Sequence, residues 1–159
     1  MDISATFAPA NQETVSLEML INKSCAPLLI PIELRGQELI IRAEGDFYGD
    51  SAWTSEAVGN MVKNCMEHTP DGGRIEINAV ETALYSEIVI KDNGTGISPE
   101  DLPHIFERFY KGKDSDGKSF GIGLALSRMI IAGQKGTVKA ENRKNAGAMF
   151  TLRFYKGTV

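Results

Sequence analysis

Two asparagines and a histidine recur every four residues in the stretch NMVKNCMEHTP. On a helix, Asn60, Asn64 and His68 would lie in one polar stripe along a single face. An asparagine amide oxygen is a neutral, hard ligand suited to Mg²⁺, which takes its remaining ligands from water and nucleotide phosphates. Taken alone, such a stripe is more often a solvated helix face. The metal interpretation therefore needs support from other segments.

The segment DNGTG, residues 92–96, offers a second set of groups. Asp92 follows an apolar, strand-like run, and a carboxylate fixed there can accept a hydrogen bond from the exocyclic amine of adenine. Guanine carries a carbonyl at that position and would be rejected. Gly94 and Gly96 permit backbone conformations and close approaches that other residues do not. The alternative is an Asp-Asn-Gly hairpin turn, but the SPEDL that follows reads as a capped helix start.

Two further segments carry groups suited to phosphate. IFERFYKGKDSDGKS combines a short apolar pattern with Arg108, Lys111 and two more lysines, which predicts a cationic lid; a solvated charged loop is the alternative. FGIGLALS places Gly121 and Gly123 before a helix, where backbone N–H groups and the positive end of the helix dipole can meet a phosphate. There the alternative is close helix packing.

The letters GKDSDGKS, residues 112–119, match the P-loop pattern G-x-x-x-x-G-K-[ST]. A working P-loop connects a buried strand to a helix, so that N–H groups converge on phosphate. Here the preceding DLPHIFERFYK has helical spacing, and Asp114 and Asp116 would place two negative charges against an anion. We therefore reject the P-loop interpretation.

Apolar periodicity and turn signals indicate the elements that must position these groups. The polar stripe belongs to a helix predicted over Ala52 to Glu67 and capped by Asp50 or Ser51. A second helix is predicted to begin at the cap Ser98. The other predicted elements are a helix within residues 15–28, strands over 31–36 and 38–45, a hairpin over 74–81 and 86–92, a helix ending at Gly133, and a closing strand pair over 136–142 and 148–155. This order predicts an α+β fold with helices on one face of a sheet.

Composition narrows the class of protein. The chain has 159 residues, 42% of them hydrophobic and 24% charged, which fits one globular domain over residues 1–159, with 1–15 as a loosely ordered leader. The net charge of −4 argues against nucleic acid as a partner. Cys25 and Cys65 form no metal-binding or disulfide pattern. We find no signal peptide or membrane-spanning run, and we expect a cytoplasmic location with no membrane contact by this chain.

In order and spacing, NMVKNCMEHTP, DNGTGIS, IFERFYKG and FGIGLALS resemble the N, G1, F and G2 boxes of the ATP-binding catalytic domain of bacterial sensor histidine kinases. The resemblance covers about residues 50–155, and four ordered boxes are far more specific than any one of them. It implies a Bergerat-type two-layer α/β sandwich, shared with gyrase, heat-shock chaperone and mismatch-repair ATPases. In that fold a mixed, mostly antiparallel sheet is covered on one face by helices, and ATP lies under a lid.

The resemblance also implies roles for individual residues. Asn64 becomes the leading Mg²⁺ ligand and Asn60 a supporting catalytic residue near metal or phosphate, while Asp92 reads adenine. Further ATP-binding candidates are Gly94, Gly96, Gly121, Gly123, His68 and, more weakly, Arg108 and Lys111. Two departures stand out: Glu67 occupies a position where relatives have Lys or Arg, and Ser119 one that often holds Gly.

The family phosphorylates a histidine on a separate dimerisation domain, in a motif with an acidic residue directly after the histidine. His68 is followed by TP and His104 by IF, so neither is expected to be the acceptor. The resemblance implies a protein-histidine kinase domain of a two-component system, acting on the dimerisation domain of its parent protein, which passes the signal to a response regulator. The parent could be membrane-anchored. Two alternatives stay open: a non-catalytic, ATP-responsive interaction module and an anti-sigma-type serine kinase.

Overall fold

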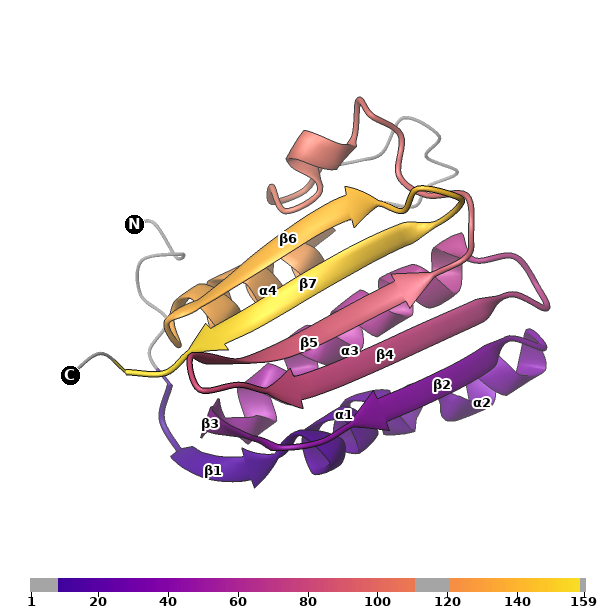
Figure 1. Ribbon diagram of the computed structural model, residues 1–159. Helices are drawn as coiled ribbons and strands as arrows, with labels where there is room; N and C mark the ends of the chain where they lie inside the picture. The colour runs from indigo at the N-terminus through magenta and orange to yellow at the C-terminus, as the bar shows by residue number, and fades with distance from the viewer. Residues whose placement is uncertain (1–8, 111–120, 158–159) are drawn as a thin grey trace.

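The computed structural model describes residues 9–110 and 121–157. Figure 1 shows their helices and strands in chain order. The elements are β1 (Gln12–Ser16), α1 (Leu17–Cys25), η2 (Ala26–Leu28), α2 (Leu29–Leu34), β2 (Glu38–Ala43), β3 (Asp46–Asp50), α3 (Ser51–His68), β4 (Arg74–Glu81), β5 (Tyr85–Asp92), η3 (Leu102–His104), α4 (Gly121–Ala132), β6 (Gly136–Asn142) and β7 (Ala148–Tyr155).

The main sheet has five strands in the order β2-β4-β5-β7-β6. The β2–β4 pair is parallel, and the other three pairs are antiparallel. A separate antiparallel ribbon joins β1 to β3. The sheet is therefore mixed and mostly antiparallel, as predicted. Strands β5 and β6 both end where β7 begins. Asp92, Asn142 and Ala148 therefore lie at the same end of the sheet (Figure 1).

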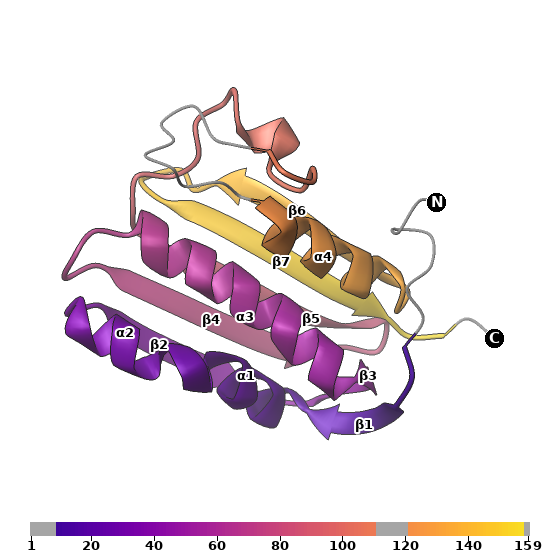
Figure 2. The same ribbon diagram turned by 180° about the vertical axis from the view of Figure 1, so that it is seen from behind.

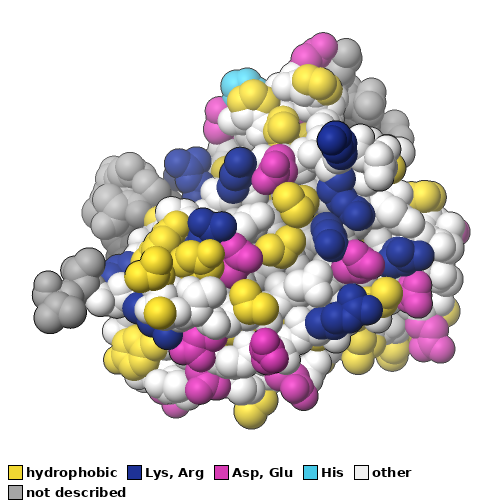
Figure 3. Space-filling model, viewed as in Figure 1, with side chains coloured by type: hydrophobic (Ala, Val, Ile, Leu, Met, Phe, Trp, Pro, Cys, Tyr) yellow, Lys and Arg dark blue, Asp and Glu magenta, His cyan; other side chains and the backbone are white. Residues whose placement is uncertain are grey.

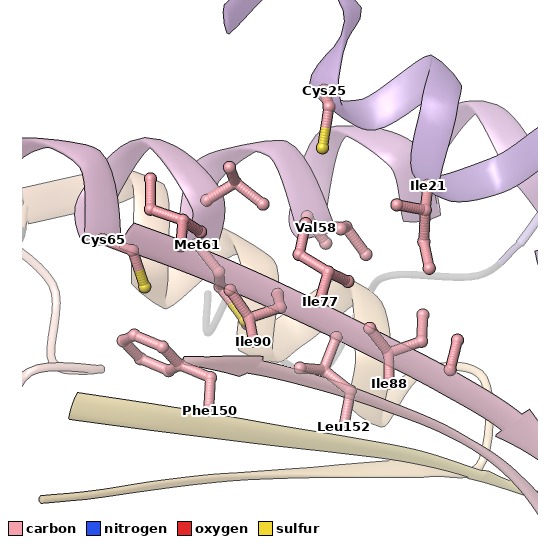
Figure 4. Packing of buried hydrophobic residues seen from close by; sticks show 14 of the residues in the cluster. Ile21, Cys25, Val58, Met61, Cys65, Ile77, Ile88, Ile90, Phe150 and Leu152 are labelled. Atoms are coloured by element: carbon pink, nitrogen blue, oxygen red, sulfur yellow. The ribbon is translucent and has the colours of Figure 1, made fainter. Parts of the chain in front are cut away.

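The α-helices of the described residues, α1 to α4, lie on one face of this sheet (Figure 2). Figure 4 shows apolar side chains of α1 and α3 pointing toward apolar side chains of the strands. Within α3, four residues at helical spacing are at most 1% exposed: Val58, Met61, Val62 and Cys65. They pack in one cluster with buried isoleucines of β4 and β5 and with Phe150 and Leu152 of β7. This confirms the predicted α+β architecture, in which one helix face drives the layer packing.

Helix α3 begins where the sequence signal placed its cap. The Asp50 carboxylate accepts a hydrogen bond from the Trp53 N–H at 3.2 Å, which satisfies one of the donors left free at the first turn. The other carboxylate oxygen accepts from the N–H groups of Ala10 and Asn11, at 3.1 and 3.2 Å. Asp50 thus fixes the start of the helix that carries the polar stripe and also holds the chain segment before β1.

The opposite face of the sheet carries charged residues of both signs among hydrophobic ones (Figure 3). Cross-strand ion pairs on this face include Arg153–Glu87 at 2.7 Å, Arg74–Glu38 at 3.3 Å and Lys91–Glu76 at 3.6 Å. Such pairs stabilise neighbouring strands only modestly where solvent reaches them. The helix-covered face therefore holds the core.

Three local predictions were wrong. Residues 31–36 were predicted as a strand, but residues 29–34 form α2. Pro31 lies in its first turn, where no N–H is required, and Gly36 ends it with a φ of +65°. The leader expected to be loose over residues 1–15 contains most of β1, because Gln12–Ser16 pair with β3.

The third wrong prediction is the helix that was expected to begin at the cap Ser98. Its hydroxyl accepts the Asp101 N–H at 3.2 Å, as a cap would, yet only the short η3 and successive turns follow. Pro103 explains the difference, because it has no N–H to donate to residue 99 and its ring would clash with that carbonyl in an α-helix. Among the described residues, no helix has the length and hydrophobicity that a membrane crossing requires.

Candidate nucleotide-binding site

Asp92 is the last residue of β5 and its side chain is only 1% exposed. Its Oδ1 accepts two backbone hydrogen bonds, from Gly94 N at 2.8 Å and from Ala148 N at 3.2 Å. Since both amides are donated to Oδ1, Oδ2 receives neither of them. A carboxylate held in this way has a fixed orientation, which suits recognition of a single donor such as an amine.

The two glycines after Asp92 are required for different reasons. A Cβ atom on Gly94 would lie 2.3 Å from the carbonyl oxygen of His68, so this glycine lets the loop touch the last turn of α3. Gly96 has a φ of +79°, which L side chains rarely adopt. The loop therefore contacts the end of the helix that carries the polar stripe.

The two asparagines of the stripe both offer an amide oxygen. Asn60 donates from Nδ2 to Gly123 O and to Ser127 Oγ, each at 3.3 Å, so its Oδ1 accepts no hydrogen bond from the described residues. Asn64, one turn further along α3, is 9% exposed, and its side chain makes no hydrogen bond within the described part of the chain. Amide oxygens one turn apart that accept no hydrogen bond from the described residues are a chemically suitable pair for Mg²⁺ or its bound water.

The first turn of α4 packs against α3 at Asn60. Ser127 is fully buried and bonds to the carbonyls of Gly123 and Ala57, at 2.8 and 3.2 Å. The three atoms nearest to a Cβ atom on Gly123 would all belong to the Asn60 side chain, at ordinary contact distances of 3.7–3.9 Å. Helix packing therefore does not require glycine at position 123, which weakens the packing alternative considered for it.

Cys65 follows Asn64 and points from α3 toward the sheet (Figure 4). Burial raises the pKa of its thiol well above the usual range, and the adjacent negative charge of Asp92 adds to the shift. A neutral thiol is therefore what borders the Asp92 carboxylate at neutral pH. The sequence placed Cys65 on the apolar face of the helix and did not predict this contact.

The remaining predicted residues are only partly brought to this site. His68 is half-buried in the last turn of α3, with its carbonyl against Gly94, and Glu67 beside it is also half-buried. Gly121 begins α4. Arg108 lies on an exposed turn with its guanidinium 5.4 Å from the Phe109 ring centre, and it bonds to none of the site residues described above. Lys111 lies outside the described residues.

The P-loop match at residues 112–119 also lies outside the described residues. What precedes it is η3 and turns up to residue 110, and a strand, which a P-loop needs, is not found there. His104 in this region is engaged with Glu107, at 2.7 Å from Nδ1 to Oε2, and stacks on Tyr110.

Three residues of the β6–β7 connection reach Asp92 or the loop after it, and sequence reasoning missed them: Asn142, Arg143 and Gly147. Arg143 Nη1 donates to the Asp92 carbonyl at 2.7 Å. The only local signal was the cluster NRKNAG, which reads as an ordinary turn. Nothing in the sequence spacing shows that a turn 50 residues away closes on Asp92.

Residues 49–158 match the family described as histidine kinase-, DNA gyrase B- and HSP90-like ATPase. The chain belongs to this family. The matched residues include α3, residues 92–97 and α4, so the candidate site lies within the matched part of the chain.

Two curated relatives of the ATPase domain are named as sensor histidine kinases. It is 32% identical over 114 residues to the sensor histidine kinase YvrG of Bacillus subtilis, covering 70% of this chain and 20% of that protein. It is 35% identical over 112 residues to the sensor histidine kinase CusS of Escherichia coli, covering 67% of this chain and 23% of that protein. The chain thus spans about a fifth of the length of these relatives.

Solved structures show the same fold. The catalytic domain of histidine kinase ThkA superposes with a TM-score of 0.81 at 22% identity, covering 92% of this chain and 99% of that one. ThkA in complex with the response regulator protein TrrA gives a TM-score of 0.76 at 21% identity, covering 92% of this chain and 42% of that one. The ATPase domain is therefore of the histidine kinase catalytic type in both sequence and fold.

A separate hollow of about 480 Å³ lies at the other end of the sheet, where β5 begins and β7 ends. Its lining includes Tyr48, Ser86, Gln134 and Lys156. It contains none of the predicted site residues. It lies apart from the predicted residues that gather around Asp92 at the opposite end of the sheet.

Proposed function

We propose that this domain binds Mg-ATP and transfers the γ-phosphoryl group to a histidine of a dimerisation domain in its parent protein. The observation that carries the proposal is that a fixed Asp92 carboxylate occurs together with the amide oxygens of Asn60 and Asn64, which accept no hydrogen bond from the described residues. Gly94 links the two, since it packs directly on the last turn of the helix that carries both asparagines.

In this proposal Asp92 binds the adenine amine, and the stripe on α3 faces the phosphates. Asn64 is the metal ligand, with Asn60 supporting metal or phosphate, and Mg²⁺ when bound supplies neutralisation of the phosphate charge. Gly121 and Gly123 let backbone N–H groups at the start of α4 approach a phosphate. Arg108, Lys111 and His68 are additional nucleotide contacts made when the lid covers the site.

The transfer is an in-line displacement. A ring nitrogen of the acceptor histidine bonds to the γ-phosphorus while the bond from that phosphorus to the β–γ bridging oxygen breaks. ADP departs with that oxygen, and the imidazole proton passes to solvent. The domain contributes chiefly by positioning the reactants and by offsetting charge, so none of its residues is required as a general base.

The surroundings of the chain's own two histidines support an acceptor histidine on another domain. His68 lies in the last turn of α3 with its backbone against Gly94, and the His104 ring is paired with Glu107. We therefore expect neither histidine to be the acceptor of the γ-phosphoryl group. We propose a response regulator as the next partner and a cytoplasmic position for this domain in a parent that could be membrane-anchored.

Radiolabel transfer tests the proposal. The chain is incubated with Mg²⁺ and γ-labelled ATP, alone and with a separately produced dimerisation domain from its own parent. We expect no label on the chain itself and acid-labile label on the added domain. Transfer should be slow and should rise with acceptor concentration, because the effective concentration of a tethered domain is lost. Asn64→Ala should eliminate transfer, whereas Asn145→Ala, at an exposed turn position, should not.

Each other outcome points elsewhere. Labelling of the isolated chain, or transfer that is indifferent to Asn64→Ala, would contradict the mechanism. Tight ATP binding without any transfer would favour a non-catalytic, ATP-responsive module. Acid-stable label would indicate transfer to serine, as in an anti-sigma-type kinase.

A further inference from the structure

The turn between β6 and β7 contacts both ends of the loop formed by residues 92–97, which we call the 92–97 loop. At its far end, Asn142 bonds to both backbone groups of Ile97: Oδ1 accepts the N–H at 2.8 Å, and Nδ2 donates to the carbonyl at 2.6 Å. This side chain therefore holds Ile97 as a neighbouring strand would. Ile97 itself is buried, so its backbone groups have little access to water if the bonds are lost.

At the near end, three groups of the same turn meet Asp92. Arg143 Nη1 donates to the Asp92 carbonyl at 2.7 Å, and Ala148 N donates to Oδ1 of its carboxylate at 3.2 Å. Gly147, with a φ of +94°, lies so close that a Cβ atom there would be 1.9 Å from the Asp92 carbonyl oxygen. The turn is closed on itself by a hydrogen bond from Arg143 N to Gly147 O at 2.8 Å.

These contacts leave the 92–97 loop with few ways to shift. At its start, the carbonyl and the carboxylate of Asp92 both accept hydrogen bonds. In its middle, Gly94 packs on α3, and at its end Ile97 bonds to the Asn142 side chain. A binding group must be kept within about 0.5 Å of its working position for a directional hydrogen bond to form well. Residues that supply such support raise affinity by preorganisation without touching the ligand.

We propose that Asn142 and Arg143 are positioning residues for adenine recognition: they hold the 92–97 loop so that Asp92 presents its carboxylate to the 6-amino group of the nucleotide. This inference rests on the proposed function, because it takes Asp92 to be the adenine-reading group. It assigns to the β6–β7 turn a role in nucleotide specificity as well as in joining two strands.

The turn provides its own matched controls. Lys144 and Asn145 are exposed, and their side chains make no hydrogen bond or ion pair within the described residues. Arg143→Met can therefore be compared with Lys144→Met, which removes the same charge, and Asn142→Ala with Asn145→Ala. Arg143→Lys keeps a cationic donor that can still reach the carbonyl and serves as the rescue variant.

The test measures the affinity of each variant for ATP and for purine riboside triphosphate, which differs from ATP only in lacking the 6-amino group. We expect Arg143→Met and Asn142→Ala to weaken ATP binding about three- to tenfold. The affinity of these variants for the analogue should stay within about twofold of the parent chain's affinity, because the analogue has no 6-amino group to bond to Asp92. The controls should match the parent chain, and Arg143→Lys should recover most of the ATP affinity.

Equal weakening of both nucleotides would mean that the turn is merely structural and would overturn the inference, as would unchanged ATP binding. A parent chain that binds ATP and the analogue equally well would instead contradict the role of Asp92 in the proposed function. Hydrogen exchange separates the two failures without any ligand: the Ile97 amide should exchange faster in Asn142→Ala, and unchanged exchange would refute the positioning contact itself. If Asn142→Ala does not fold, Asn142→Asp, which keeps the acceptor for the Ile97 N–H and loses the donor to its carbonyl, takes its place.

Discussion

The side-chain amide of Asn60 in α3 donates to the carbonyl oxygen of Gly123 in α4 at 3.3 Å, across the two helices that flank the proposed phosphate position. This bond joins two sequence motifs that lie 63 residues apart. It uses the amide nitrogen of Asn60, and the amide oxygen accepts no hydrogen bond from the described residues. We therefore expect a change in the spacing between α3 and α4 to alter the nucleotide site proposed above.

Gly123→Ala should separate binding from folding. The added Cβ would meet Asn60 at ordinary contact distances, so we expect the free energy of unfolding to be unchanged or up to about 1 kcal/mol higher, because alanine favours helix more than glycine does. ATP affinity should nevertheless fall, since the methyl group obstructs close approach of a phosphate to the start of α4. Calorimetric titration and urea unfolding of the same samples measure both quantities. Full ATP affinity in the variant would remove Gly123 from the site.

Asp92→Ala should nearly abolish adenine selectivity. A hydrogen bond to a charged group contributes about 1.5–3 kcal/mol, which corresponds to roughly tenfold or more in affinity. We expect ATP binding to weaken by at least that factor, with GTP binding little affected. Competition titrations of ATP and GTP against the parent chain and the variant give the ratio. Equal binding of the two nucleotides by the parent chain would show that Asp92 does not read the base.

Gly147→Ala should destabilise the fold strongly, because the Cβ atom would collide with the Asp92 carbonyl in addition to occupying a left-handed conformation. Gly72→Ala is the matched control: Gly72 has a φ of +82°, but a Cβ there meets nothing within 4 Å. We expect a loss of about 1–2 kcal/mol for Gly72→Ala from backbone strain alone. The loss for Gly147→Ala should be larger by about 1–3 kcal/mol. Equal losses in urea unfolding would mean that the turn moves freely away from Asp92.

Asp50 should contribute to the acid sensitivity of folding. Burial by itself would raise the pKa of Asp50, but hydrogen bonds from the backbone N–H groups of Trp53, Asn11 and Ala10 outweigh it, and the pKa lies below its ordinary value. A lowered pKa in the folded state means that the stabilisation is fully present above about pH 4 and is lost as the pH falls through the folded value. Stability should therefore decline in acid partly through this group.

Asp50→Asn tests whether the pKa of Asp50 is lowered in the folded state and whether the backbone N–H groups lower it. The amide nitrogen of asparagine would face two N–H donors, so we expect a loss of about 1–2 kcal/mol at pH 7 that narrows toward pH 3. Ser16→Ala, which removes the uncharged cap of α1, should cost about 1 kcal/mol at every pH. Urea unfolding across pH 3–7 measures both. A difference between Asp50→Asn and the parent chain that does not vary with pH would contradict the assigned pKa shift.

Local sequence signals determined much of this protein. The apolar spacing of Val58, Met61, Val62 and Cys65 fixed the buried face of α3, and the Asp50 cap fixed its start. The family was also accessible, because its signature is short motifs whose order survives in the chain. Prediction failed where the local sequence pattern was ambiguous. The apolar residues of α2 fit a strand as well as a helix. In the structure they form a helix that buries Ile32 and ends at Gly36, which has a positive φ.

What the tertiary structure alone decided is how Asp92 is held. The sequence identified its carboxylate and the glycines beside it, because these act through their own chemistry and backbone freedom. Asn142, Arg143 and Gly147 act through contacts about 50 residues away in sequence, created when β7 pairs between β5 and β6. Strand order is set by the sum of core packing across the whole sheet, and no local pattern encodes it. The sequence motifs therefore determine which chemical groups the site contains. The pairing of β7 with β5 and β6 determines how firmly Asp92 is held, because it brings the β6–β7 turn into contact with Asp92.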